Sequence, residues 1–155
     1  MVSPELLRRY PFFGFLDDSQ LKAVAMIAEE VSCQKGETLF ETEKPAEAMY
    51  LLVEGSVDLF YVVSDRDDPR LVKEFYISEI NPGEMLGISA LIEPYQYIAT
   101  ARTAAPGSFV KIEAAGLRAL CEVDAKLAYG LMRQTAKAAM SRLHDTRIQL
   151  AAARA

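Results

Sequence analysis

The stretch that decides the fold reads PGEMLGISALIEPYQYIAT over residues 82–100. A Pro-Gly turn leads through a short apolar run to Gly87, which precedes about one and a half turns of helical pattern. A polar break at Glu93-Pro94 then leads into an apolar run from Tyr97, which we expect to be a strand. A glycine turn that opens a helix leaves backbone N–H groups unpaired, and such a turn can hold an anion without a charged side chain.

Short runs separated by turn residues flank this stretch on both sides. The sequence predicts strands at 49–53, 56–63, 71–80, 97–104 and 108–112. In the second of these, Val57, Leu59, Tyr61 and Val63 alternate with other side chains, so we expect these four on the core face. The regular spacing of strands and turns is typical of a sandwich or barrel of antiparallel strands.

Helical signals lie at both ends of the chain. Asp17 with Gln20 three residues later predicts a capped helix start near the N-terminus, and Asp124 is expected to cap a long helix that runs toward the C-terminus. Gly130 lies inside that long helix. It is either a hinge, because glycine weakens a helix interior, or a site of close packing.

Composition narrows the functional classes. The 155 residues are 51% hydrophobic and 25% charged, and the net charge of −5 argues against nucleic acid or an anionic membrane as the partner. One histidine, His144, argues against a histidine-based metal site, and two cysteines, Cys33 and Cys121, fit neither a disulfide framework nor a zinc site. No signal peptide or membrane span is apparent. We therefore expect a cytoplasmic binding module, not an enzyme, with no metal and no cofactor.

The C-terminal helical segment carries a repeating stripe and an excess of positive charge. The stripe has alternating spacings of four and three and consists of Met132, Ala136, Ala139, Leu143, Thr146 and Leu150. It is typical of a coiled-coil seam, which favours a homodimer, although packing on the chain's own β domain would give the same pattern. Lys126 to Ala155 carries +5, and the other 125 residues carry −10. We interpret this charge as a solvated helix face, with an acidic partner as the alternative.

Several motifs in register resemble those of cyclic nucleotide-binding domains of the catabolite-activator and protein-kinase-A regulatory type. The matching residues, within about 10–150, are Phe12, Leu16, Leu21, Lys35-Gly36-Glu37, Leu39-Phe40, Tyr50-Leu51, Glu54-Gly55-Ser56-Val57, Pro82-Gly83-Glu84, Gly87, Ala99-Thr100 and Ile112. The resemblance implies a mainly β fold, an antiparallel β-barrel of the double-stranded β-helix (jelly-roll) type with short N-terminal helices and a long C-terminal helix. We expect an N-terminal helical segment at 1–30, a jelly-roll core at 31–113 and C-terminal helices at 114–155.

The resemblance also assigns a ligand pocket to the phosphate-binding cassette of the family. The pocket residues that it implies are Gly87, Ile88, Ser89, Ala90, Tyr97, Ile98, Ala99 and Thr100, and the lid residues are Met140, Leu143 and His144. In the family a cassette Glu holds the ribose and a cassette Arg pairs with the cyclic phosphate, whereas an ungapped alignment places Ile88 and Tyr97 at these positions. Loss of both contacts weakens affinity by several powers of ten, at about 1.4 kcal/mol per tenfold.

These features favour a regulatory or sensor module that lacks normal binding of cyclic AMP and cyclic GMP. Any small-molecule ligand of such a pocket is expected to be less charged than a cyclic nucleotide. Two alternatives stay open, namely cyclic nucleotide binding through other contacts, with Arg102 as a replacement cation, and a ligand-free scaffold for protein interactions. Because five residues follow Leu150, we expect no helix-turn-helix and no direct DNA binding.

Overall fold

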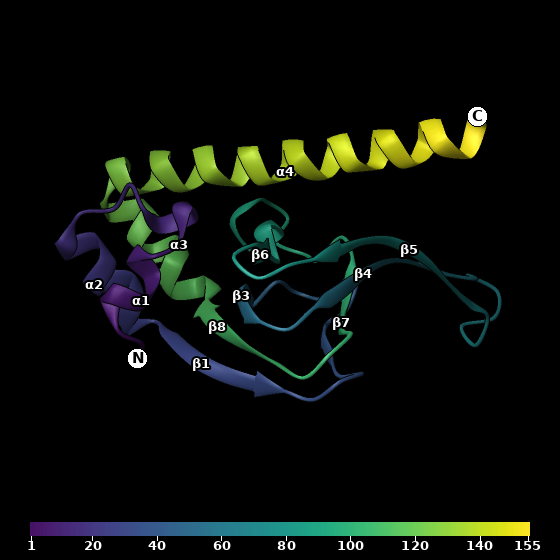
Figure 1. Ribbon diagram of the computed structural model, residues 1–155, viewed down its shortest axis with the longest axis horizontal. Coiled ribbons are helices and arrows are strands. Elements are labelled where there is room, and N and C mark those ends of the chain that lie inside the picture. The colour runs from purple at the N-terminus through teal and green to yellow at the C-terminus, as the bar shows by residue number, and fades with distance from the viewer.

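The computed structural model describes residues 1–155 as two four-stranded antiparallel sheets flanked by helices (Figure 1). The strand orders are β1-β8-β3-β6 and β2-β7-β4-β5. The strands are β1 (Ala28–Cys33), β2 (Thr38–Phe40), β3 (Ala48–Glu54), β4 (Val57–Ser64), β5 (Val72–Ile80), β6 (Met85–Leu86), β7 (Thr100–Thr103) and β8 (Gly107–Glu113). The predicted mainly β jelly roll with flanking helices is confirmed, except that the two sheets do not close into a barrel.

Two of the helices begin where the sequence predicts a cap. The helices are α1 (Pro4–Arg8), η1 (Pro11–Phe13), α2 (Asp18–Met26), η2 (Ile88–Leu91), α3 (Ala114–Val123) and α4 (Ala125–Arg154), where η marks a 3₁₀ helix. The Asp17 carboxylate accepts from the Gln20 N–H at 2.8 Å, and the Gln20 side chain accepts from the Asp17 N–H at 2.9 Å. At the start of α4, Asp124 accepts from the Leu127 N–H at 3.0 Å. Both predicted caps are confirmed, and they satisfy N–H groups that a helix end leaves unpaired.

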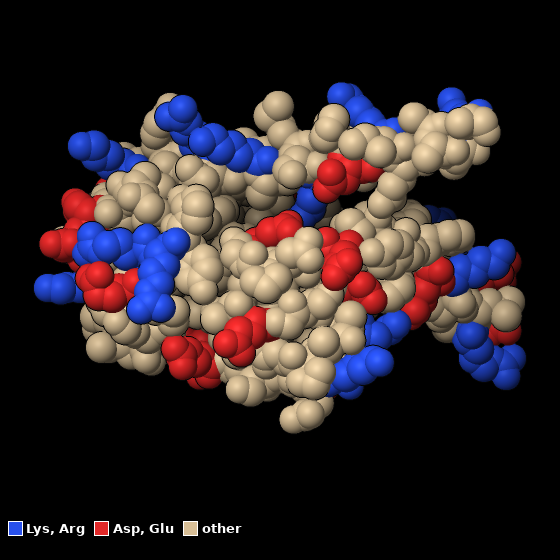
Figure 2. All heavy atoms as spheres, viewed as in Figure 1, with Lys and Arg blue, Asp and Glu red and all other residues tan.

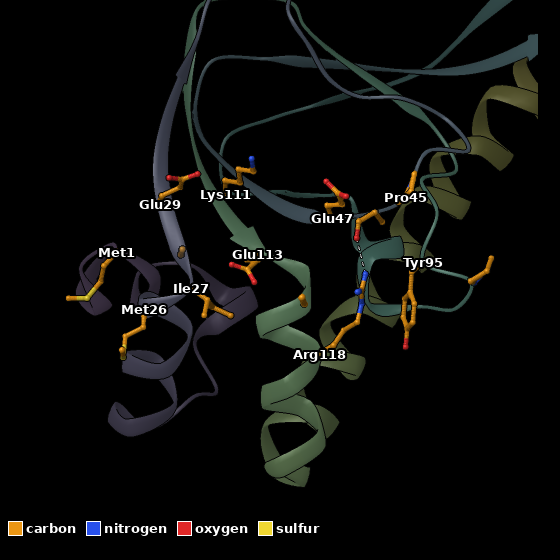
Figure 3. Close-up of a pocket in the computed structure, with 14 residues that line it drawn as sticks. Met1, Met26, Ile27, Glu29, Pro45, Glu47, Tyr95, Lys111, Glu113 and Arg118 are labelled. Atoms are coloured by element: carbon orange, nitrogen blue, oxygen red, sulfur yellow. Dashed lines mark hydrogen bonds between the residues drawn. The ribbon is translucent and has the colours of Figure 1, made fainter.

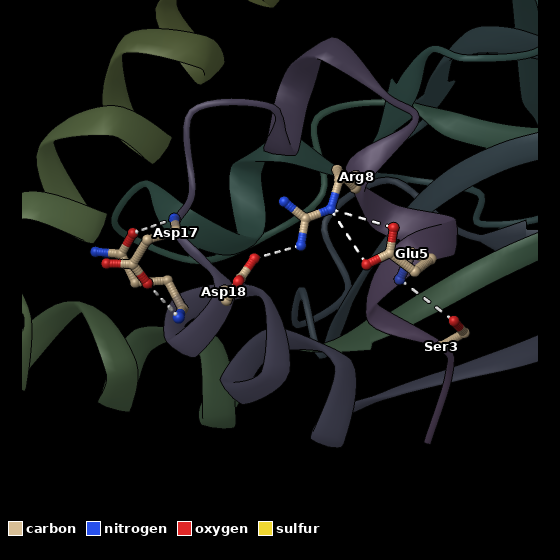
Figure 4. Close-up of polar contacts among 6 residues, drawn as sticks. Ser3, Glu5, Arg8, Asp17 and Asp18 are labelled. Atoms are coloured by element: carbon tan, nitrogen blue, oxygen red, sulfur yellow. Dashed lines mark hydrogen bonds and ion pairs between the residues drawn. The ribbon is translucent and has the colours of Figure 1, made fainter.

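Side-chain ion pairs join the first two helices near the N-terminus (Figure 4). Arg8 of α1 pairs with Glu5 in its own helix and with Asp18 in α2. These side chains are exposed, so each pair contributes little to stability. The apolar contacts beneath them do more, because Leu7 and Leu21 are fully buried.

A single apolar core joins the two sheets to the helices. It contains 32 buried residues, and among them Phe13, Leu117 and Leu127 carry this core into η1, α3 and α4. None of the helices combines the length and the apolar composition that a bilayer crossing requires.

The ribbon formed by β4 and β5 departs from the predicted alternation. Val57 and Leu59 are buried as expected, but the exposed fractions of Tyr61 and Val63 are 53% and 41%. The pairing register shifts between Leu59 and Phe60, and beyond this point the ribbon projects past the ends of β1, β3 and β8 (Figure 1). The outer half of the predicted core face is therefore solvent-exposed, because no second layer covers it.

The long helix α4 packs by its first half on the N-terminal segment. Leu127 and Leu131 are buried there, and Gly130 lies directly against the ring of Phe15. A Cβ atom at Gly130 would lie 2.0 Å from Cε2 of Phe15, far inside van der Waals contact. This geometry supports the close-packing interpretation of Gly130. The second half of α4 extends over β6 and toward β5 (Figure 1).

Candidate functional site

The cassette turn is built around one glycine. After the short strand β6, Gly87 adopts φ 74° and ψ 33°, the left-handed conformation that glycine tolerates best. A Cβ atom there would lie 3.1 Å from the carbonyl oxygen of Ala48 and 3.1 Å from Cε1 of Tyr97. Gly87 is thus required both by its backbone conformation and by the closeness of β3 and Tyr97.

Tyr97, which the ungapped alignment predicts at the arginine position of the cassette, belongs to the core. Its exposed fraction is 5%, and its ring stacks on Phe40 with the ring centroids 4.1 Å apart and the planes at 12°. Its hydroxyl donates to the carbonyl oxygen of Ala48 at 2.7 Å and accepts from the N–H of the same residue at 3.2 Å. Burial raises the pKa of this phenol. Tyr97 therefore stays neutral, paired and packed, and a buried hydroxyl with both partners in place is stable there.

The remaining predicted pocket residues divide by exposure. Gly87, Ala90 and Thr100 are buried, Ile88, Ser89 and Ala99 are half-buried, and Ile98 is 76% exposed. The strand β7 begins only at Thr100, three residues later than predicted, because the chain from Tyr95 to Tyr97 bonds instead to the loop between β2 and β3. The structure therefore directs Tyr97 inward and Ile98 outward from neighbouring positions.

Hydrogen bonds within the chain already engage several polar groups that the cassette offers. The Thr100 hydroxyl lies 3.0 Å from the backbone nitrogen and 3.0 Å from the hydroxyl of Thr42. The N–H of Ala90 donates to the carbonyl oxygen of Gly87 at 3.0 Å. Arg102, the candidate replacement cation, forms a two-bond ion pair with Glu74 at 2.9 and 3.1 Å. Its guanidinium also lies over the ring of Phe60, on the sheet formed by β2, β7, β4 and β5.

Sequence reasoning missed Arg118, which fastens α3 to the cassette. Its Nε donates to the carbonyl oxygen of Ala90 and its Nη2 donates to that of Ala46, both at 2.8 Å. The guanidinium also lies 4.1 Å from the ring centroid of Tyr95 (Figure 3). No local signal marks this arginine, because its partners are 28 and 72 positions away in the sequence.

Cavities of ligand size lie beside the cassette. One of about 910 Å³ opens between β1, β8, α3 and the loop that carries Tyr95 (Figure 3). It borders Arg118 but contains none of the predicted pocket residues. Tyr97 borders a smaller cavity of about 390 Å³ together with Phe40 and Tyr50. The hydroxyl of Tyr97 is engaged by Ala48 of β3, which lines the same cavity.

The predicted lid and seam lie on the outside of α4. The exposed fractions of Met140 and Leu143 are 70% and 49%, and His144 is also exposed. In the stripe of Met132, Ala136, Ala139, Leu143, Thr146 and Leu150, Met132 is half-buried and the others are exposed. The face of α4 that contacts the domain is instead the neighbouring one, with Leu127, Leu131, Thr135, Ala138 and Arg142. Met132 packs against the core of its own chain, and from Ala136 onward the stripe is uncovered.

Comparison with known proteins gives a consistent assignment. A sequence model of the cyclic nucleotide-binding domain family matches residues 30–124. The chain is 40% identical to a Geobacter metallireducens protein described as a cyclic nucleotide-binding protein, with a TM-score of 0.81 over 93% of this chain and 100% of that one. The N-terminal domain of a transcriptional regulator from Streptomyces coelicolor is 26% identical, with a TM-score of 0.64 over 88% and 93% of the two chains.

A curated relative is a larger protein. It is described as a potassium channel protein of Rhodopseudomonas palustris and is 23% identical over 128 residues. The match covers 83% of this chain but 29% of the relative's length.

Proposed function

Because the chain belongs to the cyclic nucleotide-binding domain family, where it is a sensor or regulatory module, we propose that its own Tyr97 closes the cassette against cyclic AMP and cyclic GMP. The observation that carries the proposal is the double hydrogen bond between the Tyr97 hydroxyl and Ala48, together with the stacking on Phe40. The matching family model describes a ligand-binding domain and indicates no enzyme.

The energetics support a closed cassette. A cyclic nucleotide at this turn would meet the apolar side chain of Ile88 in place of the carboxylate that holds the ribose, and the buried ring of Tyr97 in place of the guanidinium that pairs with the phosphate. Each charge-assisted hydrogen bond that is absent is worth about 1.5–3 kcal/mol. An anion buried without such a partner costs more than this.

Arg118 supports a regulatory role, because it offers a path from the cassette to the long helix. Its guanidinium holds the end of η2 at Ala90, and its backbone belongs to α3. Since α4 begins directly after α3, at the cap residue Asp124, a shift of the cassette would be passed to α4 through a few bonds. The signal that shifts the cassette would then be a less charged small molecule or a protein partner.

The exposed stripe on α4 supports a further part of the proposal, a homodimer through this helix. Small and apolar side chains at alternating spacings of four and three suit a coiled-coil seam. The domain-facing side chains of α4, from Leu131 to Gln149, repeat with the same spacing, and each precedes a residue of the stripe by one position. The two faces therefore run side by side along the helix.

Calorimetric titration of cyclic AMP and cyclic GMP tests the closed cassette. We expect no saturable heat with the wild-type chain and a gain of binding with Ile88→Glu/Tyr97→Arg, which restores both charged contacts. Because Tyr97→Arg removes a buried ring, Ile88→Glu alone is titrated beside it, and the thermal unfolding of each variant is recorded first.

Two outcomes of this titration separate the alternatives. Micromolar binding by the wild-type chain would overturn the closed cassette, and loss of that binding in Arg102→Ala would assign the phosphate to non-standard contacts. No binding by the wild-type chain, with binding restored in the double variant, is the result that our proposal requires.

A further inference from the structure

The helix α4 has three faces with different side chains: one buried against the domain and two exposed to solvent. A helix turns by about 100° per residue, so residues one position apart lie on adjacent faces. The domain-facing stripe is flanked on one side by the predicted seam, which starts at Met132. On the other side it is flanked by Lys126, Arg133 and Lys137, three exposed cations that share one face. A partner on the cationic side would therefore not compete with a second copy on the seam.

Two adjoining cavities turn this cationic side into a groove. One, of about 420 Å³, lies between α4 and the start of α2, and the other, of about 260 Å³, lies between α4, η1 and the turn before β6. Both are lined by Gln134 and Lys137, so they adjoin each other at these two side chains. We call this feature, with Lys126, Arg133, Lys137 and Arg142 along its α4 wall, the basic groove.

The cations of the basic groove form no ion pair within the chain, although the charge of Glu84 acts on Arg142. None of the ion pairs of the molecule involves a residue of α4. The two carboxylates that line the groove are already engaged, because Asp17 caps α2 and Glu84 accepts from the N–H of Asn81 at 3.1 Å. Figure 2 shows Lys and Arg side chains at intervals along α4, while most Asp and Glu side chains lie on the body beneath it.

Arg142 gives the inner end of the groove a hydrogen-bond donor that only a group entering the groove can reach. Its guanidinium reaches from α4 to the carbonyl oxygen of Met85, and this is its single hydrogen bond to the protein. Burial lowers the pKa of this guanidinium. A guanidinium has five donors, so most of those of Arg142 are available to an anionic group that enters the groove.

Aromatic side chains add an apolar component to the groove. The ring of Phe15, 39% exposed, forms part of the lining where it packs on Gly130, and Tyr129, 69% exposed, lies beside it. Phe12 lines the second cavity. A ligand that fills this space therefore gains by carrying apolar as well as anionic side chains.

We propose that the basic groove is a docking site for an acidic peptide segment of a partner protein that also carries apolar side chains. Charge complementarity supports this occupant. Lys126 and Lys137 are separated by about 16 Å along the helix, at 1.5 Å per residue, and about five residues of extended peptide span that length. A flat anionic membrane or a nucleic-acid duplex would touch the exposed Lys126 and Arg133 but would not reach Arg142 at the bottom of the groove.

Fluorescence anisotropy with a labelled peptide tests the proposal directly. The probe is a peptide of about six residues with carboxylates interrupted by one Leu and one Phe, and a second probe replaces these two by Ser. We expect Arg133→Glu/Lys137→Glu to weaken binding of the first probe by about tenfold or more. The matched control, Arg147→Glu/Arg154→Glu, makes the same charge change on exposed residues of α4 outside the groove and should leave binding within about twofold.

Each other outcome overturns the proposal. Equal weakening in the groove variant and the control would assign the binding to the net charge of the helix. Equal affinity for the two probes would show that apolar side chains of the peptide contribute nothing to binding, contrary to the proposal. Binding of phosphatidylserine vesicles that the groove variant abolishes, without peptide binding, would assign the surface to a membrane. A wild-type chain that binds no probe at low salt contradicts the proposal outright. The substitutions affect exposed side chains, so folding is not at risk, and the test is independent of the state of the cassette.

Discussion

The cassette pairs its polar side chains within the chain, whereas the long helix α4 leaves its charged side chains without ion-pair partners. At the cassette, the hydroxyls of Tyr97 and Thr100 are paired inside the chain. Along α4, none of the six Lys and Arg side chains has a carboxylate partner. Polar groups satisfied internally contribute to stability, whereas unpaired charges on a groove contribute to association. Substitutions at the cassette should therefore lower the free energy of unfolding, and substitutions on the outer faces of α4 should change binding at little cost in stability.

The largest effect is expected at Tyr97. Tyr97→Ala should lower the free energy of unfolding by about 3–5 kcal/mol, as for other buried aromatic residues. Tyr97→Phe keeps the ring but leaves the Ala48 backbone without its partner, at a cost of about 1–3 kcal/mol. Urea unfolding measures both. The control is Tyr129→Ala, an exposed tyrosine on α4 that should cost less than about 0.5 kcal/mol. Equal costs for the two alanine variants would erase the contrast between the cassette and the helix.

High pH should weaken the fold through the buried tyrosines. Burial raises the pKa of Tyr50 to about 12 and also raises that of Tyr97 above 10.0, the usual value. Below pH 10 both the folded and the unfolded chain hold these protons, so this contribution to stability is complete. Between that pH and the folded pKa only the unfolded chain releases them, so each tyrosine lowers the free energy of unfolding by about 1.4 kcal/mol per pH unit.

Urea unfolding at about pH 9 and about pH 11 checks this slope. Tyr50→Phe should reduce the loss of stability between the two pH values, because it removes one of the two buried phenols. Identical slopes for the wild-type chain and Tyr50→Phe would contradict the burial of this phenol.

The effect of a substitution at Gly130 on stability should be decided by packing against Phe15 and not by helix propensity. Gly130→Ala would gain about 1 kcal/mol as an isolated helix residue. Its methyl group collides with Phe15, however, and overpacking of this kind costs about 1–3 kcal/mol, so a net loss of stability is expected. A double-mutant cycle with Phe15→Ala, followed by urea unfolding, should show strong coupling between the two sites. Stabilisation by Gly130→Ala alone would favour the hinge interpretation.

The smallest effect on stability is expected on the seam side of α4. Leu143→Asp changes a half-exposed side chain and should alter the free energy of unfolding by about 0.5 kcal/mol or less. In sedimentation equilibrium the same variant should convert a dimer into a monomer, because it places a charge in the seam. Lys137→Asp, on the opposite side of the helix, should leave the dimer intact. A monomeric wild-type chain would contradict the proposed seam.

Most of the fold could be predicted from local patterns in the sequence. Asp17 with Gln20 and Asp124 lie beside the helices they cap, so their roles are legible from a few residues. The motifs that resemble cyclic nucleotide-binding domains likewise lie in register along the chain, and the jelly roll that they implied is confirmed.

Local patterns could not predict which of the pocket side chains point into the core and which point to solvent. Ile88, Tyr97 and Ile98 were expected to line one cavity, but Tyr97 is buried on Phe40 and Ile98 faces solvent. The partners that decide this, Phe40 and Ala48, are about fifty positions away in the sequence. The partners of Arg118, 28 and 72 positions away, are equally invisible to a local pattern. Tyr61 and Val63 are exposed because no second layer covers the outer half of the ribbon.

Urea unfolding of the wild-type chain with and without cyclic AMP tests the closed cassette most directly. A ligand that binds only the folded state raises the free energy of unfolding by about 2.7 kcal/mol at 100 times its dissociation constant. The closed cassette predicts the same unfolding curve at every concentration of cyclic AMP or cyclic GMP up to the millimolar range. A rise of about 1.4 kcal/mol for each tenfold increase in nucleotide would contradict it, because the nucleotide would then be binding a cassette that Tyr97 does not close.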